Sequence, residues 1–183
     1  MKKIIFSIIS SSFVLTAHAE GTYLGAGITS SRYDVNINLA NFVNHKSSTS
    51  VSAKLFAGYD LNKTWAIETG YADLGNVTAD WSFSGRRGTA KLGVQSFYVA
   101  GKGTAPVSDQ ISLFGKLGVA HTKFKQRGFP SGGGETKTGL YGSVGAEFSL
   151  SKQTSLSLEW ERYGQRNAYT KNGSLTVAAR YSF

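Results

Sequence analysis

The last ten residues of the chain, 174-SLTVAARYSF-183, alternate strictly between two kinds of side chain. One face holds Leu175, Val177, Ala179, Tyr181 and Phe183, and the other holds Ser, Thr, Ala, Arg and Ser. A period of two residues is typical of a strand with one apolar and one polar face. Such a strand would leave an exposed edge in an open sheet, whereas closure onto the first strand of a barrel leaves none. The stretch therefore predicts a closing strand of a barrel.

Seven earlier stretches repeat this alternation, and their connections alternate between long and short. Long polar connections at 34–48, 76–88, 123–137 and 165–172 alternate with short turns. Strands of about ten residues can cross a bilayer, and this rhythm is typical of up-and-down membrane barrels. We therefore expect an all-β fold, an eight-stranded antiparallel up-and-down transmembrane β-barrel. Its strands are expected at 22–33, 49–60, 65–75, 89–103, 111–122, 138–150, 154–164 and 174–183.

The composition of the polar face indicates which side of the barrel is inside. This face is mostly Gly and Ser, which suits the narrow interior of eight strands, whereas a face in water would carry many more Lys and Glu. Charges confined in a lumen need partners, and both signs occur on this face. We expect Arg180 to pair with Glu68 and Glu159. The other lumenal charges are expected at Lys102, Lys116 and Glu147, with Glu161 less clearly placed. A secreted or periplasmic barrel with the apolar face inward is the alternative.

The N-terminus has the features of a secretory signal peptide. Lys2 and Lys3 precede an apolar run over residues 4–15, and Ala17 and Ala19 occupy the small positions before a cleavage site. We expect residues 1–19 to be removed and residues 20–183 to form one outer-membrane barrel domain. This export places the mature chain in the outer membrane of a Gram-negative bacterium. The chain has no cysteine, so no disulfide framework is expected.

Three segments resemble the OmpA-like transmembrane barrels. The first is 57-AGY-59 followed by 65-WAIE-68, 70-GY-71 and 74-LG-75, and the others are 114-FGKLG-118 and 179-ARYSF-183. The resemblance implies that a lumenal cluster gates the interior and that the terminal Phe183 is read by the barrel assembly machinery. By position the gating cluster maps onto Glu68, Lys102, Glu159 and Arg180, with Lys116 nearby.

In length, the chain is similar to the small barrels of the OmpX, Ail and NspA type. OmpA itself continues into a peptidoglycan-binding domain, whereas this sequence stops at Phe183, so cell-wall anchoring is not carried over. The small barrels are associated with surface adhesion, serum resistance and lipopolysaccharide contact.

Enzyme and metal chemistry find little support in the sequence. Beyond the signal peptide the histidines are His45 and His121, with no Ser–carboxylate pattern beside His121, so neither a lipid A deacylase nor a metal site is expected. The Gly-rich run 132–134 lacks the Lys-Ser/Thr of a phosphate loop. We expect no catalysis and no cofactor.

The formal charge of +9 is concentrated in the long connections, where cations outnumber carboxylates. Export argues against nucleic acid as the partner, so we expect the loops to contact lipopolysaccharide, a host surface ligand or another anion, with the barrel monomeric. The alternative function is a narrow channel gated by the lumenal ion pairs, and a lipid A-modifying enzyme is less favoured. The expected basic patch is Arg86, Arg87, Lys123, Lys125, Arg127, Arg162 and Arg166.

Overall fold

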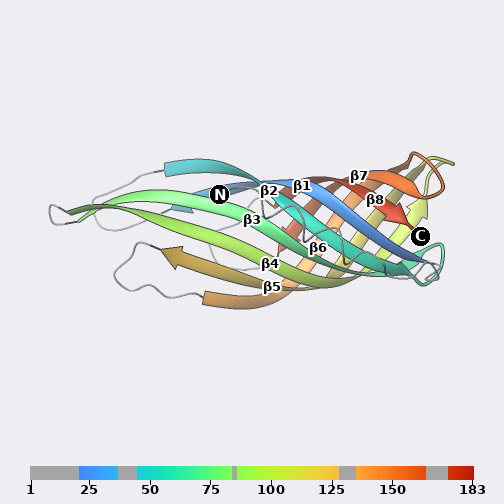
Figure 1. Cartoon of the computed structure of the whole chain (residues 1–183), viewed down its shortest axis with the longest axis horizontal. Coiled ribbons are helices and arrows are strands. Elements are labelled where there is room, and N and C mark those ends of the chain that lie inside the picture. Colours follow the sequence, from blue (N-terminus) through green and yellow to red (C-terminus); the bar gives the residue numbers. More distant parts are fainter. Residues whose placement is uncertain (1–20, 37–44, 84–85, 128–134, 164–172) are drawn as a thin grey trace, which may run out of the picture.

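Eight antiparallel strands form one closed barrel in the computed structural model, which describes residues 21–36, 45–83, 86–127, 135–163 and 173–183. Each strand pairs with the next, and β8 pairs back onto β1 (Figure 1). The expected fold is therefore confirmed. None of the described residues belongs to a helix long and apolar enough to cross a membrane. The strands are β1 (Thr22–Asn36), β2 (His45–Asp60), β3 (Trp65–Phe83), β4 (Arg86–Pro106), β5 (Ile111–Arg127), β6 (Glu135–Ser149), β7 (Thr154–Tyr163) and β8 (Ser174–Ser182).

Three tight turns, at residues 61–64, 107–110 and 150–153, lie at one end of the barrel, which we call the turn end. A side-chain oxygen near the start of each turn accepts from the backbone N–H groups that follow, which fixes a short reversal of the chain. The Asn62 Oδ1 atom lies 2.9 Å from Trp65 N, and the Ser108 Oγ atom lies 3.0 Å from Ile111 N. At the opposite end, which we call the loop end, β1, β3, β5 and β7 end and the strands that follow them begin.

Several strands reach further toward the loop end than the sequence predicts. The expected loop over 76–88 is wrong, because β3 continues to Phe83 and β4 begins at Arg86. After a register shift between Asp73 and Gly75, these residues pair in register from Asn76–Gly93 to Phe83–Arg86. A polar stretch suggests a loop when its sequence is considered alone. Here the stretch forms a strand because the neighbouring strand provides partners for its backbone hydrogen bonds. For the same reason β2 begins at His45 and β5 ends at Arg127.

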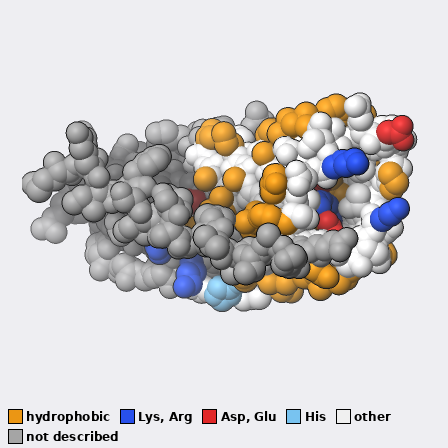
Figure 2. All heavy atoms as spheres, turned by 45° about the vertical axis from the view of Figure 1, so that its right-hand side comes forward, with side chains coloured by type: hydrophobic (Ala, Val, Ile, Leu, Met, Phe, Trp, Pro, Cys, Tyr) orange, Lys and Arg blue, Asp and Glu red, His pale blue; other side chains and the backbone are white. Residues whose placement is uncertain are grey.

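The outer wall is apolar and the interior is charged, as the sequence predicts. Outward side chains such as Leu117 and Leu140 are about 70% exposed, while lumenal Glu68 and Lys54 are almost fully buried. Figure 2 shows apolar side chains spread over the visible part of the wall, with positively and negatively charged side chains near the turn end at the right and further positively charged side chains beside the histidine at the lower left. An apolar outer surface of this extent is unsuited to water and suits a hydrocarbon surround.

Large aromatic rings fill the lumen, and five of those that the structure describes lie opposite a glycine on a neighbouring strand. The register pairs Tyr23 with Gly58 and Tyr98 with Gly70, and a Cβ atom on Gly58 would lie 2.2 Å from the Tyr23 ring. The small residues thus make space for rings, and the expectation of an interior filled mainly by small side chains was incomplete. Further pairs of this kind are Phe56–Gly25, Phe114–Gly145 and Tyr141–Gly118.

Candidate functional site: the lumenal ion-pair network

The middle of the lumen holds five ionisable side chains from four strands, which we call the central cluster. It comprises Lys54, Glu68, Lys116, Glu159 and Glu161, all between 0 and 6% exposed. The Lys116 ammonium lies 2.7 Å from a Glu68 oxygen and 2.9 Å from a Glu159 oxygen. The Lys54 ammonium lies 3.0 Å from Glu159 and 2.7 Å from Glu161. The two lysines therefore link three carboxylates into one continuous network across the barrel.

Hydroxyl groups complete the hydrogen bonding of these carboxylates. Tyr98 and Tyr23 donate to Glu68 over 2.6 and 3.0 Å. Tyr141 and Tyr163 donate to Glu161 over 2.8 and 2.9 Å, and Thr176 also bonds to Glu161. Buried charges are tolerated only when paired and hydrogen-bonded, and this arrangement meets both conditions.

The tyrosines that serve the central cluster also stack on one another. The Tyr98 and Tyr141 ring centroids are 4.2 Å apart in a stacked geometry, and Tyr163 lies 5.1 Å from Tyr141. These rings join Leu74 and Val94 in a buried cluster inside the barrel. Aromatic rings and ion pairs together fill the cross-section at this level.

A second set of charges, the turn-end cluster, lies closer to the tight turns. It comprises Asp60, Lys102, Glu147 and Arg180. The Arg180 guanidinium lies 2.5 Å from Asp60 and 3.4 Å from Glu147, and the Lys102 ammonium lies 2.8 Å from Glu147. The Arg180 guanidinium also stacks 3.8 Å above the Tyr23 ring centroid. Side-chain exposure reaches 33% at Asp60, so water screens this cluster more than the central one.

The structure divides the predicted lumenal residues between the two clusters. Glu68, Lys116 and Glu159 meet in the central cluster, whereas Lys102 and Arg180 lie in the turn-end cluster. The expected pairing of Arg180 with Glu68 and Glu159 was wrong. Arg180 is four residues along β8 from Thr176, the register partner of Glu159, which is about 13 Å at the usual rise of a strand. Its guanidinium is held by Asp60 and Glu147 instead.

Sequence reasoning missed two members of the network. Lys54 was not singled out, although it follows Ser50 and Ser52 at the two-residue period of the lumenal face. Asp60, at the end of the strand expected over 49–60, was not singled out as a lumenal charge. Alternation could have identified Lys54, but the reach of Arg180 to Asp60 depends on strand tilt, which the sequence alone does not give.

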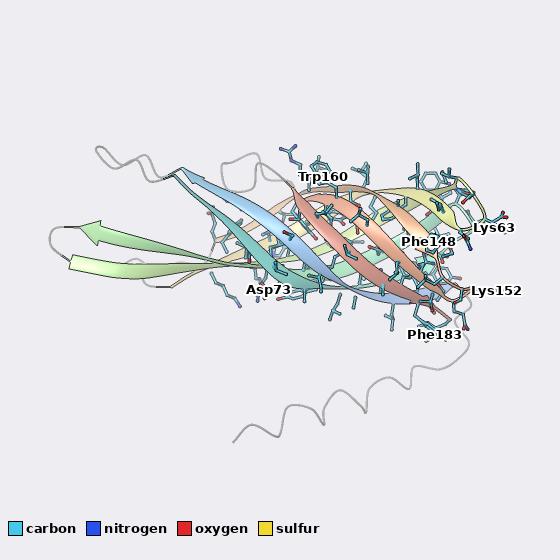
Figure 3. All side chains as sticks on the ribbon, turned by 90° about the horizontal axis from the view of Figure 1, so that it is seen from above. Lys63, Asp73, Phe148, Lys152, Trp160 and Phe183 are labelled. Carbon is cyan, nitrogen blue, oxygen red and sulfur yellow. The ribbon has the colours of Figure 1, made fainter. Side chains whose placement is uncertain are left out.

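The predicted basic patch is described only in part. Lys123, Lys125 and Arg162 have exposed side chains near the loop end of β5 and β7. Arg166 lies outside the described residues, and of Arg86, Arg87 and Arg127 only the strand backbone is described. At the other end, exposed Phe183 packs edge-on against Tyr181 with centroids 5.2 Å apart. Figure 3 shows Phe183, Lys63 and Lys152 at the turn end, with Trp160 further along the barrel.

His121 lies on the outer face of β5 with its Nδ1 atom 2.9 Å from Thr138 Oγ1. The part of the chain that the structure describes contains no group of three or more His, Cys, Asp or Glu side chains that could hold a metal ion.

A closed antiparallel barrel of eight strands with an apolar exterior and a paired, charged interior defines a transmembrane β-barrel. The chain belongs to the outer membrane protein β-barrel domain family, whose model matches residues 5–183. Its place is therefore the outer membrane. No curated protein matches the sequence.

Three solved structures share the fold at low sequence identity. Ail, the attachment invasion locus protein of Yersinia pestis, is 19% identical with a TM-score of 0.59, over 90% of this chain and 99% of that one. Neisserial surface protein A is 15% identical with a TM-score of 0.59, over 90% and 98%. The N-terminal barrel of Pseudomonas aeruginosa OprF is 10% identical with a TM-score of 0.51, over 90% and 98%. Ail has also been solved with the heparin analogue sucrose octasulfate.

Proposed function

We propose that this barrel serves a structural and surface-interaction role in which cations at its loop end bind anionic groups, first of all the phosphates of lipopolysaccharide. The outer face of β5 carries the observation that supports this. Leu113, Leu117 and Val119 are exposed apolar residues, and the same face continues with His121, Lys123 and Lys125. The cations thus begin where the apolar band ends, at the level expected for lipid headgroups.

The outer face of β7 repeats this order. Leu156 and Leu158 precede Trp160 and then exposed Arg162, so an interfacial aromatic again separates the apolar band from a cation. In the register, Lys123 faces Gln95 and Thr136, which are uncharged. Charges without a carboxylate directly opposite remain available to an external anion, and lipopolysaccharide phosphate is the densest anion in the outer leaflet. A sulfated host polysaccharide is the second candidate, since Ail is known with a heparin analogue.

The packing of the lumen favours this role over the narrow channel. The central cluster is almost fully buried, and stacked Tyr98 and Tyr141 fill the space beside it. Ion movement would require a buried pair to separate, which is costly without a replacement partner. We therefore propose that the lumenal charges form a polar core. The proposal assigns no catalytic role.

The proposal also covers the export, processing and membrane assembly of the chain. Residues 1–19 direct export and are removed, residues 20–183 form the monomeric mature barrel, and the assembly machinery recognises Phe183. Exposed Phe183 beside Tyr181 at the turn end supports that last step, because the ring is accessible at the end of the final strand.

Binding of the refolded barrel to lipopolysaccharide tests the proposal. Each exposed Lys near an anionic surface contributes about 1 kcal/mol, so the double variant Lys123→Ser, Lys125→Ser should bind roughly 10- to 30-fold more weakly at low salt. High salt should weaken the wild type toward the variant, since exposed charges are screened within about 8 Å at 0.15 M.

A double variant at the opposite end, Lys63→Ser with Lys152→Ser, is the matched control and should retain binding. Phosphate-stripped lipopolysaccharide should bind the wild type as weakly as it binds the Lys123, Lys125 variant. Equal affinity of the wild type for intact and stripped forms would refute the proposal and favour a protein partner.

A further inference from the structure

The outer wall carries an apolar groove of about 590 Å³ across β7, β8, β1, β2, β3 and β4. This volume falls within the roughly 300–1,000 Å³ of typical small-molecule sites. Ala26, Ala57 and Ala179 lie among its lining residues, beside the larger Leu55, Tyr71 and Phe97. In the register, Ala179, Ala26, Leu55, Tyr71 and Phe97 form one row across five neighbouring strands. The groove is therefore a depression at small residues between larger ones, on the face turned to the membrane.

The groove rises from the turn end toward the middle of the barrel. Its lowest lining residue, Thr154, begins β7 directly after the turn at 150–153, and Phe97 lies nine residues into β4 from Pro106. At about 3.3 Å per residue and a tilt near 45°, those nine steps span about 20 Å of height. One leaflet contributes about half of a hydrocarbon core roughly 30 Å thick. From the turn end the groove therefore reaches at least the middle of the core, which is the depth that one acyl chain of that leaflet covers.

The groove offers few free hydrogen-bonding groups to a protein partner. Thr69, the polar side chain near its middle, donates its hydroxyl to the Tyr98 carbonyl over 2.9 Å. A second copy of the chain related by a two-fold axis would place groove against groove and leave an unfilled space. A flexible hydrocarbon chain fits such a depression, and hydrocarbon already surrounds this face.

A cation lies close in sequence to the lower end of the groove. Lys152 is exposed in the turn at 150–153, two residues before Thr154, and Figure 3 shows it at the turn end of the barrel. An ammonium at this level can contact a lipid phosphate while the acyl chain extends upward. We propose that the groove binds one acyl chain of a phospholipid from the leaflet at the turn end, with its phosphate at Lys152. This site is separate from the loop-end cations and from the lumen.

Native mass spectrometry of the full barrel, extracted from membranes in mild detergent, tests the site. The wild type should retain one phospholipid. The variant Ala57→Phe fills the groove and should lower the retained fraction about tenfold, the effect of losing about two buried methylene groups. The matched control is Ala146→Phe, which places the same ring on outward β6 between Leu113 and Leu158 and should retain the lipid. Circular dichroism verifies that both variants are folded.

Two further measurements identify the ligand. Lys152→Gln should lower retention and Lys152→Arg should preserve it, because only the charge at that position is required. Barrels refolded with phospholipid alone should show an adduct that Ala57→Phe removes, whereas a lipopolysaccharide adduct held by the loop-end cations should be unaffected by Ala57→Phe. The proposal is overturned by equal retention in Ala57→Phe and Ala146→Phe, by a wild type without lipid, by a lipopolysaccharide adduct that Ala57→Phe removes, or by a dimer that Ala57→Phe dissociates.

Discussion

The two charged clusters of the lumen both pair cationic side chains with carboxylates, but in different surroundings. In the central cluster, two lysines link three carboxylates that are at most 2% exposed, and tyrosine hydroxyls complete the network. In the turn-end cluster, Arg180 and Lys102 hold Glu147 and Asp60, and Asp60 is one-third exposed. We therefore expect burial and hydrogen-bond completeness, rather than charge count, to set what each ion pair contributes to stability.

Removing a cation from the central cluster should have the largest effect. Lys116→Met leaves Glu68 and Glu159 without their shared partner in a nearly dry interior, and should lower the free energy of unfolding by about 3–5 kcal/mol. Urea unfolding in lipid vesicles measures the change. Adding Glu68→Gln should recover part of the loss, since it removes one stranded charge. Lys63→Met, in an exposed turn, is the control, and an equal loss there would contradict the comparison.

Crowding the ring that supports the central cluster should have an intermediate effect. A Cβ atom at Gly70 would lie 2.5 Å from the Tyr98 ring, so Gly70→Ala must displace the tyrosine that donates to Glu68. We expect a loss of about 1–3 kcal/mol in unfolding free energy. Gly115→Ala is the matched control, because its Cβ atom would meet its nearest neighbour at an ordinary 3.7 Å. Similar losses in both variants would show that backbone entropy, not the ring, is responsible.

Removing Arg180, one of the two cations of the turn-end cluster, should have the smallest effect. Arg180→Met leaves Asp60 accessible to water and Glu147 still paired with Lys102, so we expect a loss of about 1–2 kcal/mol, between exposed and buried pairs. Added salt should reduce the difference between wild type and Arg180→Met, yet leave the effect of Lys116→Met almost unchanged. A double-mutant cycle should show coupling of Arg180 to Glu147 and none to Glu68.

Local alternation was sufficient to predict the number of strands and the direction of their side chains, but not how far several strands extend. Leu158 and Leu175 are exposed outward, and Glu68 and Glu159 are buried inward, as the period of two requires. Partners across the lumen could not be predicted, because they depend on tilt and stagger of whole strands. Arg180 illustrates this, since its correct face was predicted and its partners were not. Likewise, the polar sequence around Asn76 predicts a loop, and only its pairing with β4 shows that it forms a strand.

The pairing of β8 with β1 has a consequence for how the chain acquires its structure. Seven of the eight strand pairs join neighbours in sequence, but this one bonds Thr29 to Thr176 and Ser31 to Ser174, hydroxyl to hydroxyl, across almost the whole chain. Hairpins can therefore form in the order of synthesis, while closure waits for β8, the last of the eight strands to emerge. Until then β1 and β7 both carry open edges able to recruit foreign strands. The chain therefore remains prone to aggregation until β8 pairs with β1 and β7. Any delay in that pairing prolongs the exposure of the two open edges.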